Sequence, residues 1–150
     1  MPEKKKVKTP EPVVLPKGYR LSEKDEYMNP LQLEYFRLKL LKWRKELVDD
    51  SRDTLRSLVE ETADTYGTSG DDVDRANDEA LKQLELRTRD RERKLIKKID
   101  EALERIDVGD YGYSEISGEP IGLKRLEAKP TAEMTMEEQK EHEAREKLYK

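Results

Sequence analysis

The chain has no cysteine, one histidine and little continuous apolar sequence, and these absences exclude several classes of protein. Without cysteine there is no disulfide, no thiolate nucleophile and no ordinary structural zinc site. No apolar run approaches the roughly 20 residues that a membrane-spanning helix needs. The lysine-rich start lacks the apolar stretch of a secretory signal. We therefore expect a cytoplasmic protein without a membrane partner.

Charged side chains dominate the sequence. They make up 44% of the 150 residues, against 33% for the hydrophobic class, and the net charge is −4. Such a chain cannot build a thick globular core, but it suits elongated helices that each bury a narrow stripe. Because it has no basic surplus, we expect no direct sequence-specific binding to DNA. No nucleophile with a nearby base and no phosphate-binding glycine loop is recognisable, so we do not expect an enzyme.

Two periodic stripes predict a pair of long helices. Asn29 is a good N-cap and Pro30 fits the first helical position. The first stripe follows at spacings of three and four, as Leu33, Phe36, Leu40, Trp43 and Leu47. This helix should fade near residues 62–66, before a glycine-rich reversal. A second helix should run from about Asp72 to about Asp107, with Gly109 at its C-terminal end.

The second stripe consists of Leu84, Leu95, Ile99, Ala102 and Ile106, with Thr88 and Arg91 on the same face. Paired with the first, it predicts a mainly α fold: a long antiparallel two-helix coiled-coil hairpin at residues 33–107, with its tip at 66–76. Residues 1–18 should form a flexible, basic and proline-rich arm, and residues 19–32 should pack on the base. A hairpin that satisfies its own seam needs no partner helix, so we expect a monomer.

The remaining segments should form a small globular base and a C-terminal helix. Residues 108–135 carry an apolar cluster, and residues 136–150 form the helix, capped by Thr135. The expected cluster is Tyr111, Tyr113, Ile116, Ile121, Leu123 and Leu126. Ser114 and Ser117, then Thr135 and Glu138, are spaced as cysteines would be in a zinc finger. Hydroxyls are not ionised at neutral pH and one carboxylate cannot hold the ion, so this region should be metal-free.

Two further features can carry function. Asp71, Asp72 and Asp74 gather at the expected tip, where they either cap the second helix or present carboxylates to a metal centre or basic loop of a partner. The arginine-rich run at residues 86–98 either forms a solvated face with ion pairs along the helix or contacts a partner. Arg91 favours the contact role because it lies on the apolar stripe.

Five segments together resemble the DksA branch of the DksA/TraR family: residues 26–29, 71–76, 84–99, 111–113 and 126–132. The resemblance covers roughly residues 26–150. It implies a protein that binds bacterial RNA polymerase, inserts the hairpin into the secondary channel and places the tip near the catalytic Mg²⁺. Members destabilise open promoter complexes and act with the alarmone ppGpp in the stringent response. They repress ribosomal RNA promoters and activate some amino-acid biosynthesis promoters.

The resemblance also assigns residues. The tip contacts would be Asp71, Asp74 and Ala76, and the coiled-coil contacts Arg87, Thr88 and Arg91. The ppGpp-site candidates are Leu95, Lys98, Lys129, Gln139 and Lys140. Lys129 replaces a more usual arginine, and Gln139 replaces a common lysine that the adjacent Lys140 could supply. The family's four zinc-binding cysteines correspond to Ser114, Ser117, Thr135 and Glu138, so the resemblance implies a zinc-free member.

Two other functions stay open at this point. The same acidic tip could stimulate transcript cleavage in backtracked complexes, as Gre-type elongation factors do. The hairpin could also be a structural coiled-coil adaptor without a polymerase partner.

Overall fold

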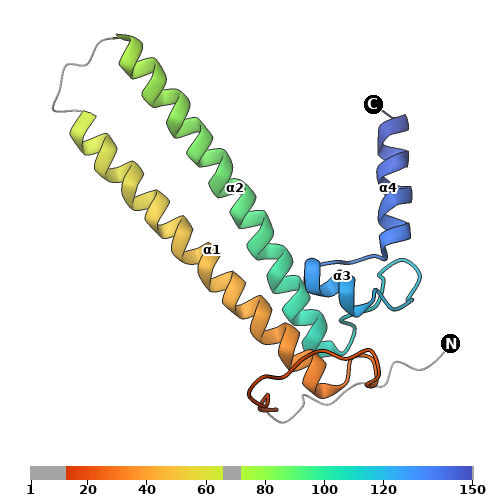
Figure 1. The fold of residues 1–150 in the computed structure, drawn as a ribbon. Helices are drawn as coiled ribbons and strands as arrows, with labels where there is room; N and C mark the ends of the chain where they lie inside the picture. Colours follow the sequence, from red (N-terminus) through yellow and green to blue (C-terminus); the bar gives the residue numbers. More distant parts are fainter. Residues whose placement is uncertain (1–12, 66–71, 150) are drawn as a thin grey trace. The chain divides into compact units, whose positions relative to one another are not determined.

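The computed structural model of the protein describes residues 13–65 and 72–149. Four helices follow one another, α1 (Pro30–Thr65), α2 (Asp72–Val108), α3 (Leu123–Ala128) and α4 (Met136–Leu148), as Figure 1 shows. The mainly α fold class is therefore confirmed. No helix in these ranges combines the length and apolar character needed to cross a membrane. The chain divides into two compact units, a base unit (residues 1–41 and 99–150) and a hairpin unit (residues 42–98).

The start of α1 is fixed by side chains, as its sequence predicts. The Asn29 side chain accepts a hydrogen bond from the backbone N–H of Gln32 at 2.9 Å. The Gln32 amide in turn accepts from the backbone N–H of Met28 at 2.8 Å and donates to the carbonyl of Ser22 at 3.2 Å. Gln32 is fully buried, so these bonds satisfy an amide that would otherwise be costly. They tie the segment before α1 to the first turn of the helix.

The base unit is built around the near ends of the two long helices. Phe36 and Leu40 of α1 are fully buried, and so is Ile99 of α2. Ala102 and Ile106 continue the buried stripe of α2 at the predicted spacing. These five positions confirm both heptad stripes within the base. α2 then ends where predicted: Gly109 takes a positive φ of 84°, a conformation that glycine adopts without steric cost.

Tyrosines and aliphatic residues after α2 complete this core. Tyr111 is 1% exposed, packs on Phe36 with ring centroids 5.6 Å apart, and donates its hydroxyl to the carbonyl of Pro130 at 2.7 Å. Burial raises the pKa of Tyr111. The predicted cluster members Ile121, Leu123 and Leu126 are buried as well. Ile116 is 66% exposed, so its predicted place in the core is wrong. It lies in a tight turn closed by the bond from the Gly118 N–H to the Ser114 carbonyl, which leaves its side chain outside.

The hairpin unit has a seam of mixed polar and apolar side chains. Its two arms lie side by side and antiparallel (Figure 1), and none of the side chains described in this unit is buried. The half-buried residues of α2 in this unit are Lys82, Glu85, Arg89, Glu92, Leu95 and Ile96. On α1 the half-buried apolar residues are Trp43, Leu47 and Val48. The Ser51 hydroxyl of α1 donates to the Glu92 carboxylate across this seam at 2.6 Å.

The predicted second stripe holds only in part in the hairpin unit, where Leu95 is half-buried. Leu84 is 59% exposed, and Thr88 and Arg91 are exposed too. The bond from Ser51 turns the Glu92 face of α2 toward α1. Leu84, eight residues earlier, lies about 80° around the helix from Glu92.

Candidate functional site

The four positions spaced like zinc-finger cysteines meet in one hydrogen-bonded cluster. The Ser114 hydroxyl donates to Oε2 of Glu138 at 2.6 Å, and the Ser117 hydroxyl donates to Oε1 at 2.7 Å. The Thr135 hydroxyl also donates to Oε1, at 3.1 Å. It caps α4 as predicted, because it accepts from the backbone N–H of Glu138 at 3.2 Å. We call these four residues the hydroxyl–carboxylate cluster. It joins the first turn of α4 to the loop after Tyr113.

The cluster favours a charged carboxylate and does not suit zinc. Hydrogen bonds from Ser114 and then Ser117 hold the pKa of Glu138 below its usual value. A zinc ion would instead need several ionised or imidazole ligands, and three neutral hydroxyls with one carboxylate do not fit it. Across the described ranges, no group of three histidine, cysteine, aspartate or glutamate side chains could hold a metal ion.

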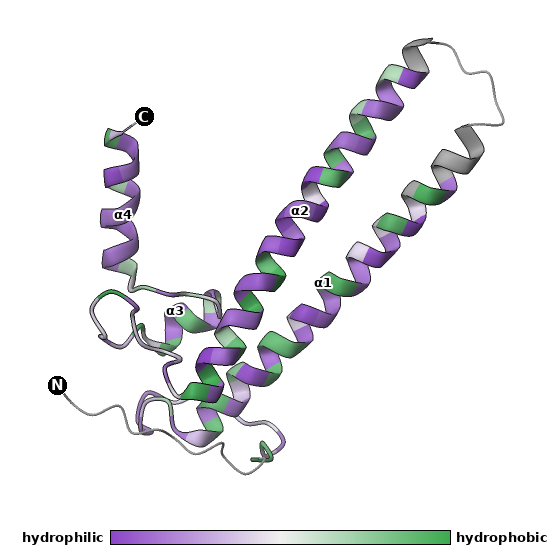
Figure 2. Cartoon of the chain, turned by 180° about the vertical axis from the view of Figure 1, so that it is seen from behind, coloured by the Kyte–Doolittle hydropathy of each residue, from purple (hydrophilic) through white to green (hydrophobic). Residues whose placement is uncertain are grey.

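The cluster is also the main anchor of α4. None of the residues of α4 is buried, and Figure 2 shows the helix as hydrophilic along most of its length. The Arg125 side chain adds two further bonds nearby, from Nε to the carbonyl of Met134 at 2.9 Å and from Nη1 to Sδ of Met136 at 3.7 Å. Sequence reasoning predicted a metal-free base but missed these contacts. One feature of the sequence could have indicated them: three hydroxyls and one carboxylate occupy the four positions that would bind the metal in a zinc finger.

A second candidate site lies on α2 in the hairpin unit. Arg87, Thr88 and Arg91 are all exposed, and their spacing of three and four residues places them on neighbouring turns. The Thr88 hydroxyl donates back to the carbonyl of Leu84 at 3.0 Å. Within the described ranges neither arginine forms an ion pair or a hydrogen bond through its guanidinium. Two uncommitted guanidinium groups can bind carboxylates or carbonyl groups of a partner, often through two parallel bonds.

The predicted tip falls mostly outside the described residues. Asp71 precedes the second described range, and Asp74 lies in the first turn of α2 with its side chain outside the description. Ala76 is described, and its side chain is exposed. The roles that the sequence analysis assigns to the tip residues therefore stay predictions.

The ppGpp-site candidates belong to both units. In the hairpin unit, Leu95 is half-buried and Lys98 is exposed. In the base unit, Lys129 and Lys140 are exposed. The side-chain amide of Gln139 is engaged by Glu143, to which it donates at 3.0 Å.

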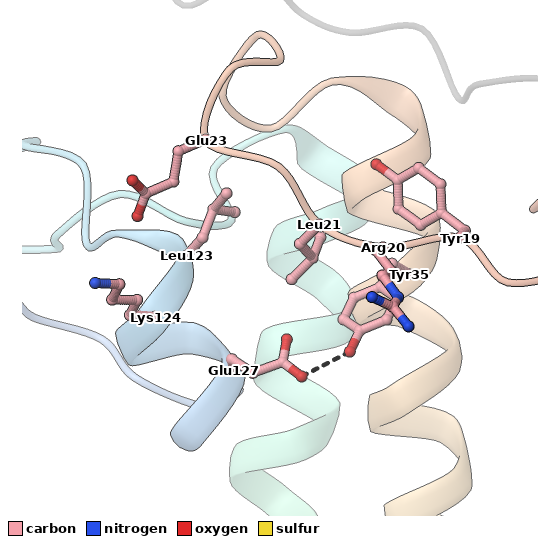
Figure 3. A pocket seen from close by; sticks show the side chains of 8 residues that line it. All are labelled: Tyr19, Arg20, Leu21, Glu23, Tyr35, Leu123, Lys124 and Glu127. Atoms are coloured by element: carbon pink, nitrogen blue, oxygen red, sulfur yellow. Dashed lines mark hydrogen bonds between the residues drawn. The ribbon is translucent and has the colours of Figure 1, made fainter.

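The base unit also contains a cavity of about 470 Å³ that the sequence did not suggest. It lies among residues 19–23, α1 and α3 (Figure 3). One wall is held by the Tyr35 hydroxyl, which donates to Glu127 of α3 at 2.7 Å. The wall joins side chains 92 residues apart, so no local pattern could indicate it.

These features define a class of protein: a helical hairpin with an arginine-bearing face and a small base that contains a hydroxyl–carboxylate cluster. The model of the N-terminal domain of the DnaK suppressor protein DksA matches residues 32–106. The chain belongs to the DksA family.

The sequences of individual DksA proteins are similar to this chain over most of its length. The RNA polymerase-binding transcription factor DksA of Caulobacter vibrioides is 53% identical over 132 residues, which cover 88% of this chain and 90% of the relative. The protein of that name from Escherichia coli K12 is 44% identical, covering 86% of this chain and 83% of its own length. Among solved structures, the transcription factor DksA2 from Pseudomonas aeruginosa has a TM-score of 0.70 and 40% identity, covering 81% of this chain and 90% of that one.

Proposed function

We propose that this chain binds bacterial RNA polymerase and regulates transcription initiation. Relatives of near-equal length are named as RNA polymerase-binding transcription factors, at up to 53% identity among those described above. The single structural observation that carries the proposal is the exposed α2 face with Arg87, Thr88 and Arg91. Guanidinium groups lose hydration free energy when they are buried. Such a face therefore suits a protein surface whose carboxylates and carbonyl groups replace the lost bonds to water.

The hairpin would act by insertion into the secondary channel. Arg87 and Arg91 would hold α2 against the channel wall, and the tip residues Asp71, Asp74 and Ala76 would approach the catalytic Mg²⁺. Carboxylates placed there act on a hard cation directly or through water. The result would be a less stable open promoter complex, with repression of ribosomal RNA promoters and activation of some amino-acid promoters. In this role the chain is not an enzyme, and it needs no sequence-specific contact with DNA.

The alarmone ppGpp would be an effector shared with the polymerase. Lys98, Lys129 and Lys140 are exposed cations that suit its phosphates. Gln139 carries no charge, and Glu143 engages its amide, so we expect a weaker ppGpp response than a lysine at this position would give. The protein would act as a cytoplasmic monomer.

The base would work without zinc. The hydroxyl–carboxylate cluster joins α4 to the loop after Tyr113, as a metal would by binding residues of both segments. Because none of its side chains is a thiolate, its geometry should not respond to oxidants. The same argument makes the cluster independent of zinc supply.

The proposal is tested with purified RNA polymerase and two matched variants. Asp74→Asn should keep affinity for core polymerase within a few-fold, yet lose inhibition of a ribosomal RNA promoter in single-round transcription. Asp78→Asn removes an exposed aspartate one turn further along α2 and should inhibit like the unaltered chain. Full inhibition by Asp74→Asn would disprove the role of the tip.

Binding is tested separately by competition. The unaltered chain should displace a labelled secondary-channel binder from core polymerase. If it instead stimulates transcript cleavage in stalled complexes, the Gre-type function is the correct one. If no displacement and no cleavage occur, the chain acts as an adaptor without a polymerase partner.

A further inference from the structure

We infer that the cavity of the base unit binds a small amphoteric ligand of the amino-acid type, with a carboxylate, an ammonium group and an apolar side chain. Its volume of about 470 Å³ lies in the range of small-molecule sites. Figure 3 shows the cavity between the segment before α1, α1 itself and the short helix α3. We call it the base cavity. It contains none of the residues assigned to the polymerase or ppGpp contacts.

The base cavity has an apolar and aromatic lining that suits the side chain of such a ligand. Leu123 is only 8% exposed, and Leu21 lines the cavity as well. The rings of Tyr19 and Tyr35 have centroids 6.3 Å apart and planes inclined by 53°. Aromatic rings in this tilted arrangement offer both faces and edges to a further ring. An aromatic or branched aliphatic side chain is therefore the expected apolar part.

Three charged groups at the cavity are uncommitted and have both signs. Arg20, Lys124 and Glu23 line it and are exposed. None of the three side chains makes a hydrogen bond or an ion pair within the described ranges. Figure 3 shows Glu23 and Lys124 on one side of the cavity and Arg20 on the other, beside Tyr35. Lys124 therefore suits the carboxylate of the ligand, and Glu23 suits its ammonium group. A purely anionic ligand would face repulsion from Glu23, and a purely cationic ligand would face repulsion from the other two.

The fourth charged group of the lining is already used in the wall. The Glu127 carboxylate accepts from the Tyr35 hydroxyl at 2.7 Å and forms an ion pair with Lys39 at 3.2 Å. Lys39 also donates to the backbone carbonyl of Glu127 at 2.8 Å. Burial, followed by the bond to Glu127, raises the pKa of Tyr35 to about 12, so its hydroxyl stays a donor at neutral pH. The wall between α1 and α3 is thus formed before any ligand arrives, which lowers the entropic cost of binding.

Three probes of one skeleton test the charge requirement. The full chain, labelled with ¹⁵N, is titrated at pH 7 with L-phenylalanine, 3-phenylpropanoate and 2-phenylethylamine. L-phenylalanine should cause saturable amide shifts at residues 19–23 and 123–127, and each of the other probes should bind about tenfold more weakly or less. Equal binding of 3-phenylpropanoate would overturn the amphoteric assignment. No saturable shifts with any probe would overturn the site.

Charge-removing variants test the residues. Lys124→Gln and Glu23→Gln should each weaken L-phenylalanine binding by about tenfold. Both side chains are exposed, so the variants should fold, which the unchanged remainder of the spectrum would verify. Lys24→Gln alters an exposed neighbour that does not line the cavity, and it should leave the affinity unchanged. Equal affinity in all three variants would refute the proposed contacts.

Discussion

Replacing Ser114 by alanine should destabilise the base unit through the hydroxyl–carboxylate cluster. The Ser114 hydroxyl donates to Glu138 at 2.6 Å and accepts from the backbone N–H groups of Ile116 at 3.1 Å and Ser117 at 3.3 Å. Ser114 is 5% exposed, so water does not fully replace these bonds. One bond to a charged acceptor contributes about 1.5–3 kcal/mol in other proteins, and the variant should lose about 2 kcal/mol. For a chain of this length, that loss lowers the melting temperature by roughly 4–8 °C.

The assay follows the base unit specifically. Near-ultraviolet circular dichroism during urea unfolding reports on its packed tyrosines, such as Tyr111, which is 1% exposed. Ser57→Ala is the matched control, because Ser57 is an exposed serine of α1 in the hairpin unit. It should change the free energy of unfolding by no more than about 0.5 kcal/mol. If Ser114→Ala proves as stable as the control, the cluster contributes nothing and the account of the metal-free base is wrong.

Three further predictions concern the cluster and the seam. Because the pKa of Glu138 is lowered from 4.5 in the folded state, its stabilisation is present above that value and is lost as pH falls through the folded pKa. Acid unfolding should therefore depend less on pH in Glu138→Gln, and an unchanged slope below pH 5 would contradict this. Placing cysteine at Ser114, Ser117, Thr135 and Glu138 together should give about one equivalent of bound zinc by elemental analysis, and none would show that the four positions do not converge. Glu85→Leu should stabilise the hairpin unit by about 1 kcal/mol, because a buried oxygen of this carboxylate has no partner in the described ranges. Urea unfolding monitored by the single tryptophan measures it, and a loss of stability would show that the carboxylate is satisfied.

The helix limits were predictable because their signals are local. Asn29 caps α1 through a residue three positions away, and Thr135 caps α4 in the same way. Gly109 ends α2 through its own backbone conformation. Helix α3 was not predicted, because it lacks such a local signal. It has six residues, and its N-cap Gly122 forms no side-chain bond, so the sequence carries no start signal.

Contacts between distant segments were not predictable from periodicity. Leu84 was expected at the seam, but its burial depends on which face of α2 turns toward α1, and contacts such as the bond from Ser51 to Glu92 help to decide that. The bond between Ser114 and Glu138 spans 24 residues, and the spacing of four polar residues could not indicate that one carboxylate would accept from three hydroxyls. The base cavity likewise needs three segments to meet before its lining forms.

The most direct test compares two arginines of α2 in binding to core RNA polymerase. Arg91 lies on the exposed face proposed as the contact, and Arg93 is exposed two residues on, about 200° around the helix. Measured by equilibrium competition, Arg91→Ala should weaken binding by about tenfold or more, as expected for a central arginine of an interface. Arg93→Ala should bind within about twofold of the unaltered chain. Equal losses in the two variants, or no loss in either, would contradict the proposed mode of binding.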